Sequence, residues 1–155
     1  MVLLFVQLDL SDNDIGGYLD EAMLRLIYTP EGSEAIAKAL RASASLTSVN
    51  LLLNKLGPEG AQHIGKGIAV SASLTSIDIG FNSIGKEMAL KLVGIFKEKQ
   101  MVSVGLASCS LDVDGAQAVA DYISVSASLT KVLTFLTSHS LSYSTLTASA
   151  GFCTD

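Results

Sequence analysis

The sequence lacks tryptophan and is poor in charged side chains. Asp, Glu, Lys and Arg make up only 16% of its 155 residues, whereas hydrophobic residues make up 49%. Such a hydrophobic content argues against an intrinsically disordered chain. The formal net charge of −5 argues against a general nucleic-acid binder, which needs a basic surface to neutralise phosphates. The length is that of one ordinary domain.

Cysteine is also scarce. Cys109 and Cys153 are the only two, too few for a disulfide framework, and no Asn-x-Ser/Thr glycosylation site occurs. The apolar start of the chain, MVLLFV, has no positive charge before Arg25 and no cleavage site, so it does not read as a signal peptide. These absences favour a reducing compartment, and we expect a cytoplasmic protein.

Long uncharged apolar runs are missing before Lys131, which argues against membrane spans there. Residues 132–154 contain no Asp, Glu, Lys or Arg, but they include His139 and many Ser and Thr residues. Two interpretations stay open for this segment: a frayed or partly docked terminus, which we favour, and a membrane tail anchor.

What the chain does contain is an internal repeat. The string Ser-Ala-Ser-Leu-Thr begins at Ser43, Ser71 and Ser126, at intervals of 28 and 55 residues, and 55 is 28 plus 27. A fixed period of this length is typical of solenoid architectures, in which each turn of the chain is one structural unit.

A second pattern, L-x-x-L-x-L-x-x-N/C-x-L, occurs four times in the same period. Apolar residues two apart, such as Val49 and Leu51, face the same side of a short strand. The polar position after each strand predicts a structural ladder, in which a buried side chain bonds the main chain of the neighbouring turn. Its members are Asn13, Asn54, Asn82 and Cys109.

The second half of each repeat predicts a helix. Proline and glutamate, as in Pro58–Glu59, suit a first helical turn, and apolar residues such as Ala61, Ile64 and Ile68 follow at helical spacing. One strand and one helix cannot bury their apolar faces alone, whereas stacked units can.

The segment LTSVNLLLNKLGPEGAQHIGKGIAVSAS resembles the leucine-rich repeats of the ribonuclease-inhibitor type, found also in NOD-like receptors and Ran GTPase-activating protein. The resemblance covers about residues 5 to 130. It implies an α/β fold: a right-handed leucine-rich-repeat solenoid of about 4–5 repeats, with a parallel concave sheet and helices on the convex side. We assign residues 1–136 to the solenoid and 137–155 to an uncharged Ser/Thr-rich tail.

The sequence departs from the period between Ile15 and Pro30, where an insertion near residues 16–28 adds 13 residues. Leu19, Met23, Leu26 and Ile27 can share one face of a short helix. We therefore expect either a helical insertion or a distorted first repeat. Packing over the open N-terminal end is the role we favour, and a binding role for the insertion stays open. At the other end, Leu129 and Val132 predict a fifth strand, and no polar cap is apparent.

Motifs for chemistry are weak. Gly60–Lys66 and Gly80–Lys86 both match the first seven positions of a phosphate-binding loop, but Gly67 and Glu87 replace the hydroxyl residue that would bind magnesium. His63 and His139 lack carboxylates at metal-ligand spacing, and no nucleophile elbow occurs. We expect no enzyme activity, no cofactor and no metal, and we assign Cys109 a packing role.

The remaining candidates are the outward-facing strand positions, which the period identifies. They predict an apolar centre flanked by carboxylates, a plausible site for a protein partner with a basic rim. The alternative that Leu53 or Phe81 packs against a neighbouring turn stays equally open. The proposed contact residues are Asp9, Asp12, Asn50, Leu52, Leu53, Asp78, Phe81 and Ser108.

The sequence thus predicts a non-catalytic protein-protein interaction module that binds a partner of unknown identity through its concave face. Two alternatives stay open: a regulator of a small GTPase or an innate-immune receptor assembly, and a self-associating fragment whose uncapped ends pair. Only Arg25 and Arg41 could supply an arginine finger, and neither falls on the predicted concave face.

Overall fold

The computed structural model describes residues 6–133 and 145–147 of the chain. The elements are β1 Val6–Asp9, β2 Gly17–Asp20, β3 Arg25–Tyr28, α1 Pro30–Ala42, β4 Leu46–Asn50, α2 Gly57–Val70, β5 Ser76–Asp78, α3 Lys86–Lys99, β6 Ser103–Gly105, α4 Val113–Val125, β7 Lys131–Leu133 and β8 Thr145–Thr147. From β1 to β7 strands and helices alternate along the sequence, except for the inserted pair of strands β2 and β3.

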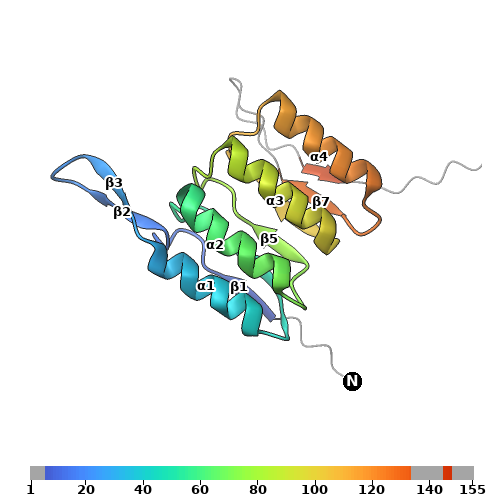
Figure 1. The fold of residues 1–155 in the computed structure, drawn as a ribbon, viewed down its shortest axis with the longest axis horizontal. Helices are drawn as coiled ribbons and strands as arrows, with labels where there is room; N and C mark the ends of the chain where they lie inside the picture. The colour runs from blue at the N-terminus through green and yellow to red at the C-terminus, as the bar shows by residue number, and fades with distance from the viewer. Residues whose placement is uncertain (1–5, 134–144, 148–155) are drawn as a thin grey trace, which may run out of the picture.

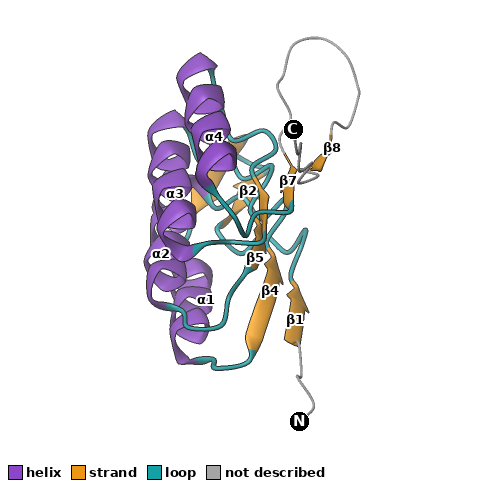
Figure 2. Cartoon of the chain, turned by 90° about the vertical axis from the view of Figure 1, so that its right-hand side faces the viewer, coloured by secondary structure: helices purple, strands orange, loops and turns teal. Residues whose placement is uncertain are grey.

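The repeats form two layers, a sheet and a row of helices (Figure 2). The sheet has the order β1-β4-β5-β6-β7-β8, and the first five of these strands are parallel. The helices α1 to α4 stack side by side along one face of it (Figure 1). This arrangement confirms the predicted α/β solenoid, including the fifth parallel strand at Lys131–Leu133.

The core lies between the two layers. Val49 and Leu51 of one turn, and Ile77 and Ile79 of the next, are almost fully buried and face the helices. The helices contribute Ile64, Ile68, Leu92 and Phe96 from their inner faces. Each turn therefore buries apolar side chains from its strand and its helix, which accounts for the high hydrophobic content without a membrane. Among the described residues, no helix is long and apolar enough to cross a bilayer.

The Ser-Ala-Ser segments are the turns that lead from each helix to the next strand. The first serine of each accepts a hydrogen bond from the amide three residues later, as Ser43 does from Leu46 at 3.0 Å. In the second and third copies, the second serine donates to a carbonyl of the preceding turn, Ser73 to Leu46 at 2.8 Å and Ser128 to Met101 at 3.2 Å. Hydroxyl groups thus satisfy the turn backbone, and the turns need no charged residues.

The insertion is a β-hairpin, so the helix expected over Leu19–Ile27 is wrong. β2 and β3 pair antiparallel, from Gly17 opposite Tyr28 to Asp20 opposite Arg25. The hairpin extends away from the stacked repeats beside the N-terminal end of α1 (Figure 1). Its apolar side chains are exposed, including Leu19, Met23 and Leu24.

The tail boundary at residue 136 and the segment around His139 lie outside the described residues. Of the predicted tail, the structure describes β8, which pairs antiparallel with β7 from Lys131 opposite Thr147 to Leu133 opposite Thr145. This pairing extends the parallel sheet by one antiparallel strand.

Candidate interaction surface

The outward strand positions line up across the sheet as the period predicts. Asp9 lies opposite Asn50, Asn50 opposite Asp78, and Asp78 opposite Gly105. Each of the three polar side chains accepts a hydrogen bond from the amide two residues later. The donors are Ser11 at 2.9 Å, Leu52 at 3.1 Å and Gly80 at 2.9 Å. These side chains therefore hold the chain as it leaves the strand, besides facing outward.

The two carboxylates of this row differ in their surroundings. The pKa of Asp9 is lowered, chiefly because the amide and hydroxyl of Ser11 donate hydrogen bonds to it. The pKa of Asp78 is raised by burial, against the opposing effects of the Gly80 amide and the Lys131 charge. Asp78 lies over the next strand, where a Cβ added at Gly105 would collide with its carboxylate. Only a glycine leaves room for Asp78 to lie in this way.

A second row follows just beyond the strand ends. Its members have φ in the left-handed region, which residues other than glycine rarely adopt. The φ angles are 57° for Asp12, 58° for Leu53, 55° for Phe81 and 51° for Ser108. The amide of each of the first three donates to the next turn: Asp12 to Leu52 at 2.9 Å, Leu53 to Gly80 at 3.2 Å, and Phe81 to Ala107 at 2.7 Å. The backbone conformation is thus a property of the repeat, while the side chain is free to vary.

Leu53 and Phe81 stand at matching positions of adjacent turns and are 44% and 41% exposed. Leu52 has a different environment, although it belongs to the same predicted apolar centre. It is half-buried, and its Cδ1 lies 3.0 Å from where a Cβ of Gly80 would be. Leu52 therefore fills the space above a glycine, and the exposed apolar patch consists of Leu53 and Phe81.

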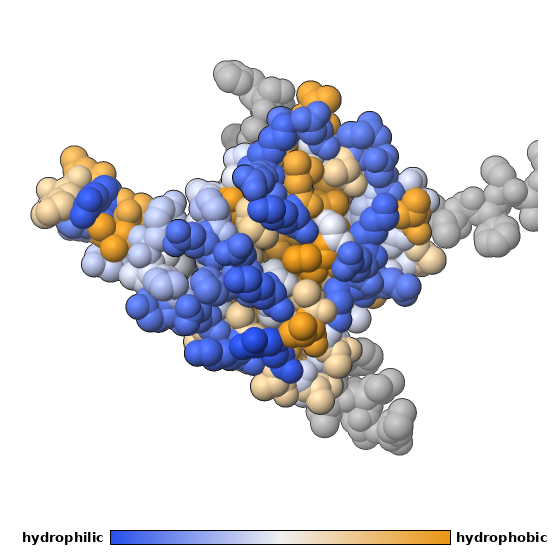
Figure 3. Space-filling model, viewed as in Figure 1, coloured by the Kyte–Doolittle hydropathy of each residue, from blue (hydrophilic) through white to orange (hydrophobic). Residues whose placement is uncertain are grey.

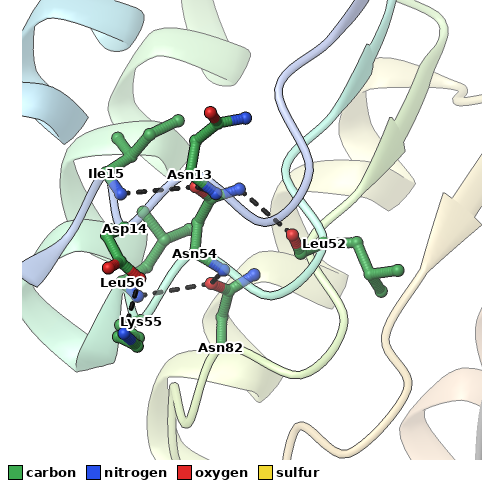
Figure 4. A network of polar contacts seen from close by, with 8 residues as sticks. All are labelled: Asn13, Asp14, Ile15, Leu52, Asn54, Lys55, Leu56 and Asn82. Carbon is green, nitrogen blue, oxygen red and sulfur yellow. Dashed lines mark hydrogen bonds and ion pairs between the residues drawn. The ribbon is translucent and has the colours of Figure 1, made fainter. Parts of the chain in front are cut away.

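Behind this surface the asparagine ladder joins the turns (Figure 4). The Oδ1 of Asn82 accepts from the amides of Asn54 at 2.8 Å and Leu56 at 3.3 Å. Asn54 repeats the arrangement one turn earlier, accepting from Asn13 at 3.1 Å and Ile15 at 3.3 Å. Both side chains are fully buried, and their hydrogen bonds join each turn to the preceding one.

The outer ladder positions are different. Asn13 is exposed, and its Nδ2 donates to the carbonyl of Ser11 within its own turn. Cys109 is buried, and its Sγ lies 3.7 Å from the carbonyl oxygen of Ile79 and 3.6 Å from that of Ala107. Burial raises the pKa of this thiol to about 12, with the Asp78 carboxylate adding to the effect. A thiol of that pKa is protonated at neutral pH and is a poor nucleophile.

The remaining chemical candidates fall into ordinary structural positions. Gly60 and Gly65 lie inside α2, and Gly85 with φ of 75° precedes α3, so the two glycine–lysine motifs are not equivalent loops. His63 lies 3.8 Å from Glu34 on the helix layer. Within residues 6–133 and 145–147, no three His, Cys, Asp or Glu side chains are grouped to hold a metal ion.

Sequence reasoning missed the exposed apolar side chains of the hairpin. Tyr18 and Leu19 are about half exposed, and Leu24 is 84% exposed at φ of 48°. The alternation that would identify two short strands is obscured, because the apolar residues of this segment also match a helical spacing. The turn, Glu21–Leu24, lacks the Asn-Gly or Asp-Gly pair that indicates a tight hairpin.

Comparison with known families agrees with this architecture. The family model for the leucine-rich repeat matches residues 5–17, 42–65 and 70–93. The matched segments contain β1, β4 and β5 and much of α2 and α3, so the chain contains leucine-rich repeats. Domains of this class generally mediate protein-protein interaction and are generally non-catalytic. The search of curated proteins gave no match.

Proposed function

We propose that this protein is a non-catalytic, ribonuclease-inhibitor-like interaction module that binds a protein partner through the concave face of its sheet. The contact centre is the apolar patch of Leu53 and Phe81, flanked by Asp9, Asp12 and Asp78. Asn50, Leu52 and Ser108 complete the surface as supporting polar and packing positions. A cytoplasmic location agrees with the free, buried thiol of Cys109.

The observation that carries the proposal is the conformation of Leu53 and Phe81. A left-handed backbone costs about 1–2 kcal/mol for a residue with a β-carbon, and Asn or Asp is less penalised there. The same position holds Asp12 and Ser108 in the flanking turns, so the repeat does not require a large apolar side chain. Leu53 and Phe81 keep 44% and 41% of their surface exposed at these strained positions, and burial of that surface by a partner is a reason for apolar residues there.

The flanking charges define the partner. Asp9, Asp12 and Asp78 place carboxylates around the apolar patch, and the described residues of this face include Lys131 as the nearby cation that acts on Asp78. A complementary partner would insert apolar or aromatic side chains between Lys or Arg residues. The face carries neither of the two arginines, since Arg25 lies in β3 and Arg41 in α1. This placement gives the small-GTPase alternative no support.

The decisive experiment replaces both apolar residues with asparagine, which tolerates the left-handed conformation. Leu53→Asn/Phe81→Asn should unfold at the same or a higher urea concentration than the wild type while losing partner binding in quantitative affinity purification. The control is Val113→Asn/Val125→Asn, which removes two exposed apolar side chains from α4. An identical partner profile for wild type and the Leu53/Phe81 variant would refute the assignment.

Self-association through the solenoid ends is tested separately. Light scattering coupled to size exclusion should give a monomer mass at micromolar protein concentration if the patch serves a different protein. A dimer that the Leu53/Phe81 variant dissociates would assign the patch to a second copy of this chain instead.

A further inference from the structure

A basic groove lies on the helix layer, on the opposite side of the molecule from the apolar patch. It runs between α1 and α2 and encloses about 130 Å³. Hydrophilic residues gather over these two helices in the space-filling view (Figure 3). The side chains that matter along its walls are Glu34, Lys38, Arg41, His63 and Lys66. One carboxylate thus faces three permanent cations and a histidine, in a chain whose net charge is −5.

Close packing of the helices brings the cations together. Gly67 lies at the floor of the groove, and a Cβ added there would lie 2.9 Å from both the Cα and the carbonyl oxygen of Ala37. α1 and α2 can approach this closely only because position 67 has no side chain. Lys38 and Lys66, each next to one of these contact residues, therefore stand on facing walls.

Within the part of the chain that the structure describes, the three cations of the groove form no ion pair. The ion pairs among the described residues engage Lys55, Lys86 and Lys91, and none engages Lys38, Arg41 or Lys66. The carboxylate of the groove, Glu34, is 3.8 Å from His63. Arg41 lies in the last turn of α1, where a positive charge interacts favourably with the negative end of the helix dipole, but Lys38 and Lys66 precede the last turns of their helices.

The repeat does not require this charge either. One period after Lys38 is Lys66, but the next two matching positions hold Gly94 and Asp121. The cluster of cations between α1 and α2 therefore has no counterpart at the matching positions of α3 and α4, and the start of α4 carries Asp112 and Asp114. The cluster is a local feature of the first two helices.

We propose that this groove binds an extended, carboxylate-rich peptide segment of a protein partner. Lys38 and Arg41 are three residues apart on one helix, which separates them by about 4.5 Å along its axis. Cations spaced along an open groove fit a row of carboxylates better than one compact anion. The site is distinct from the apolar patch, so it adds an acidic ligand to a protein whose other face favours a basic one.

The test uses a fluorescein-labelled hexaglutamate peptide and fluorescence anisotropy at about 50 mM salt, where screening is weak. Lys38→Gln/Arg41→Gln/Lys66→Gln should weaken the binding of hexaglutamate by up to about tenfold relative to the wild type. The matched control is Arg25→Gln/Lys91→Gln/Lys97→Gln, which removes one arginine and two lysines from exposed positions elsewhere. The control has the same net charge as the groove variant and should bind like the wild type.

Three outcomes would overturn the proposal. The peptide does not bind the wild type, both triple variants lose affinity equally, or a single-stranded oligonucleotide binds as tightly as hexaglutamate and loses affinity in the groove variant alone. The second outcome indicates a net-charge effect and the third a general polyanion site. Circular dichroism and urea unfolding of both variants verify that the helices persist, because glutamine is a good helix former.

Discussion

Asn82 and Cys109 occupy the same place in adjacent turns, yet they connect those turns in different ways. The carboxamide of Asn82 is both a donor and an acceptor. Its Nδ2 donates to carbonyls, and its Oδ1 accepts hydrogen bonds from two amides of the preceding turn. The thiol of Cys109 has contacts to the carbonyls of Ile79 and Ala107, and no amide donates to it among the described residues. The coupling between turns is therefore stronger in the middle of the solenoid than at its C-terminal side.

The comparison also separates what burial does from what hydrogen bonding does. Both residues are almost completely buried, so both occupy the space inside the loop. Only the asparagine accepts hydrogen bonds from main-chain amides, and leaving a buried amide without an acceptor costs about 1–3 kcal/mol. Filling the cavity is thus enough to keep the fold at position 109, while joining the turns requires the carboxamide.

The largest effect is expected on the reactivity of the Cys109 thiol in the folded compared with the unfolded protein. In a Cys153→Ser variant, where Cys109 is the only thiol, alkylation by iodoacetamide at about pH 8 should be at least about a thousandfold slower in the folded than in the urea-unfolded protein. Burial is the main cause, because it raises the thiol pKa from 9.0 to about 12. The same shift makes the contribution of Cys109 to stability complete below pH 9.0, with a progressive loss as the pH rises toward 12. A native rate within tenfold of the unfolded rate would contradict the buried position.

The next largest effect is expected for Asn82→Ala. The substitution removes five hydrogen bonds in a fully buried site, and the free energy of unfolding should fall by about 3 kcal/mol or more. The bonds lost are those to the carbonyls of Leu51, Ile79 and Gly80 and those from the amides of Asn54 and Leu56. Urea denaturation followed by circular dichroism measures the change. A loss below about 1 kcal/mol would show that the ladder adds little to stability.

Cys109→Asn tests the comparison in the opposite direction. If position 109 differs from position 82 only in lacking a side-chain oxygen, an asparagine there should accept hydrogen bonds from the amides of Asn82 and Ile84. The free energy of unfolding should then rise by about 1 kcal/mol. The control is Cys109→Ala, which leaves the space unfilled and should lower stability by about 1 kcal/mol. If the asparagine variant were no more stable than the alanine variant, packing rather than hydrogen bonding would decide the residue at this position.

Much of this architecture could be predicted from the sequence, because it is periodic. The strand rows, the ladder and the helix starts at Pro30 and Gly57–Pro58 recur at a fixed interval, so each copy supports the others. The hairpin occurs once and has no second copy to compare with. Whether Leu52 or Leu53 is exposed also depends on one neighbour, Gly80, whose missing side chain leaves a space that Leu52 fills. The conformation of a feature that occurs only once depends on tertiary contacts, and a local sequence pattern does not contain these contacts.

The basic groove was beyond sequence reasoning for a related reason. Lys38 and Lys66 are 28 residues apart, and the period does place them at matching positions of neighbouring helices. What the period does not give is the close approach at Gly67 and Ala37, or the absence of partner carboxylates among the described residues. Charge on an exposed helix face is usually solvated, so only the packing distinguishes this cluster.

The smallest effect is expected at the N-terminal ladder position. Asn13→Ala should lower the free energy of unfolding by no more than about 0.5 kcal/mol, because the side chain is exposed and its bond to Ser11 stays within one turn. Asn54→Ala, the matched substitution one turn inward, removes four hydrogen bonds to other residues and should cost about 2 kcal/mol. Parallel urea titrations of the two variants give the difference directly. Equal losses would mean that the contribution of a ladder residue to stability depends neither on its burial nor on its hydrogen bonds between turns.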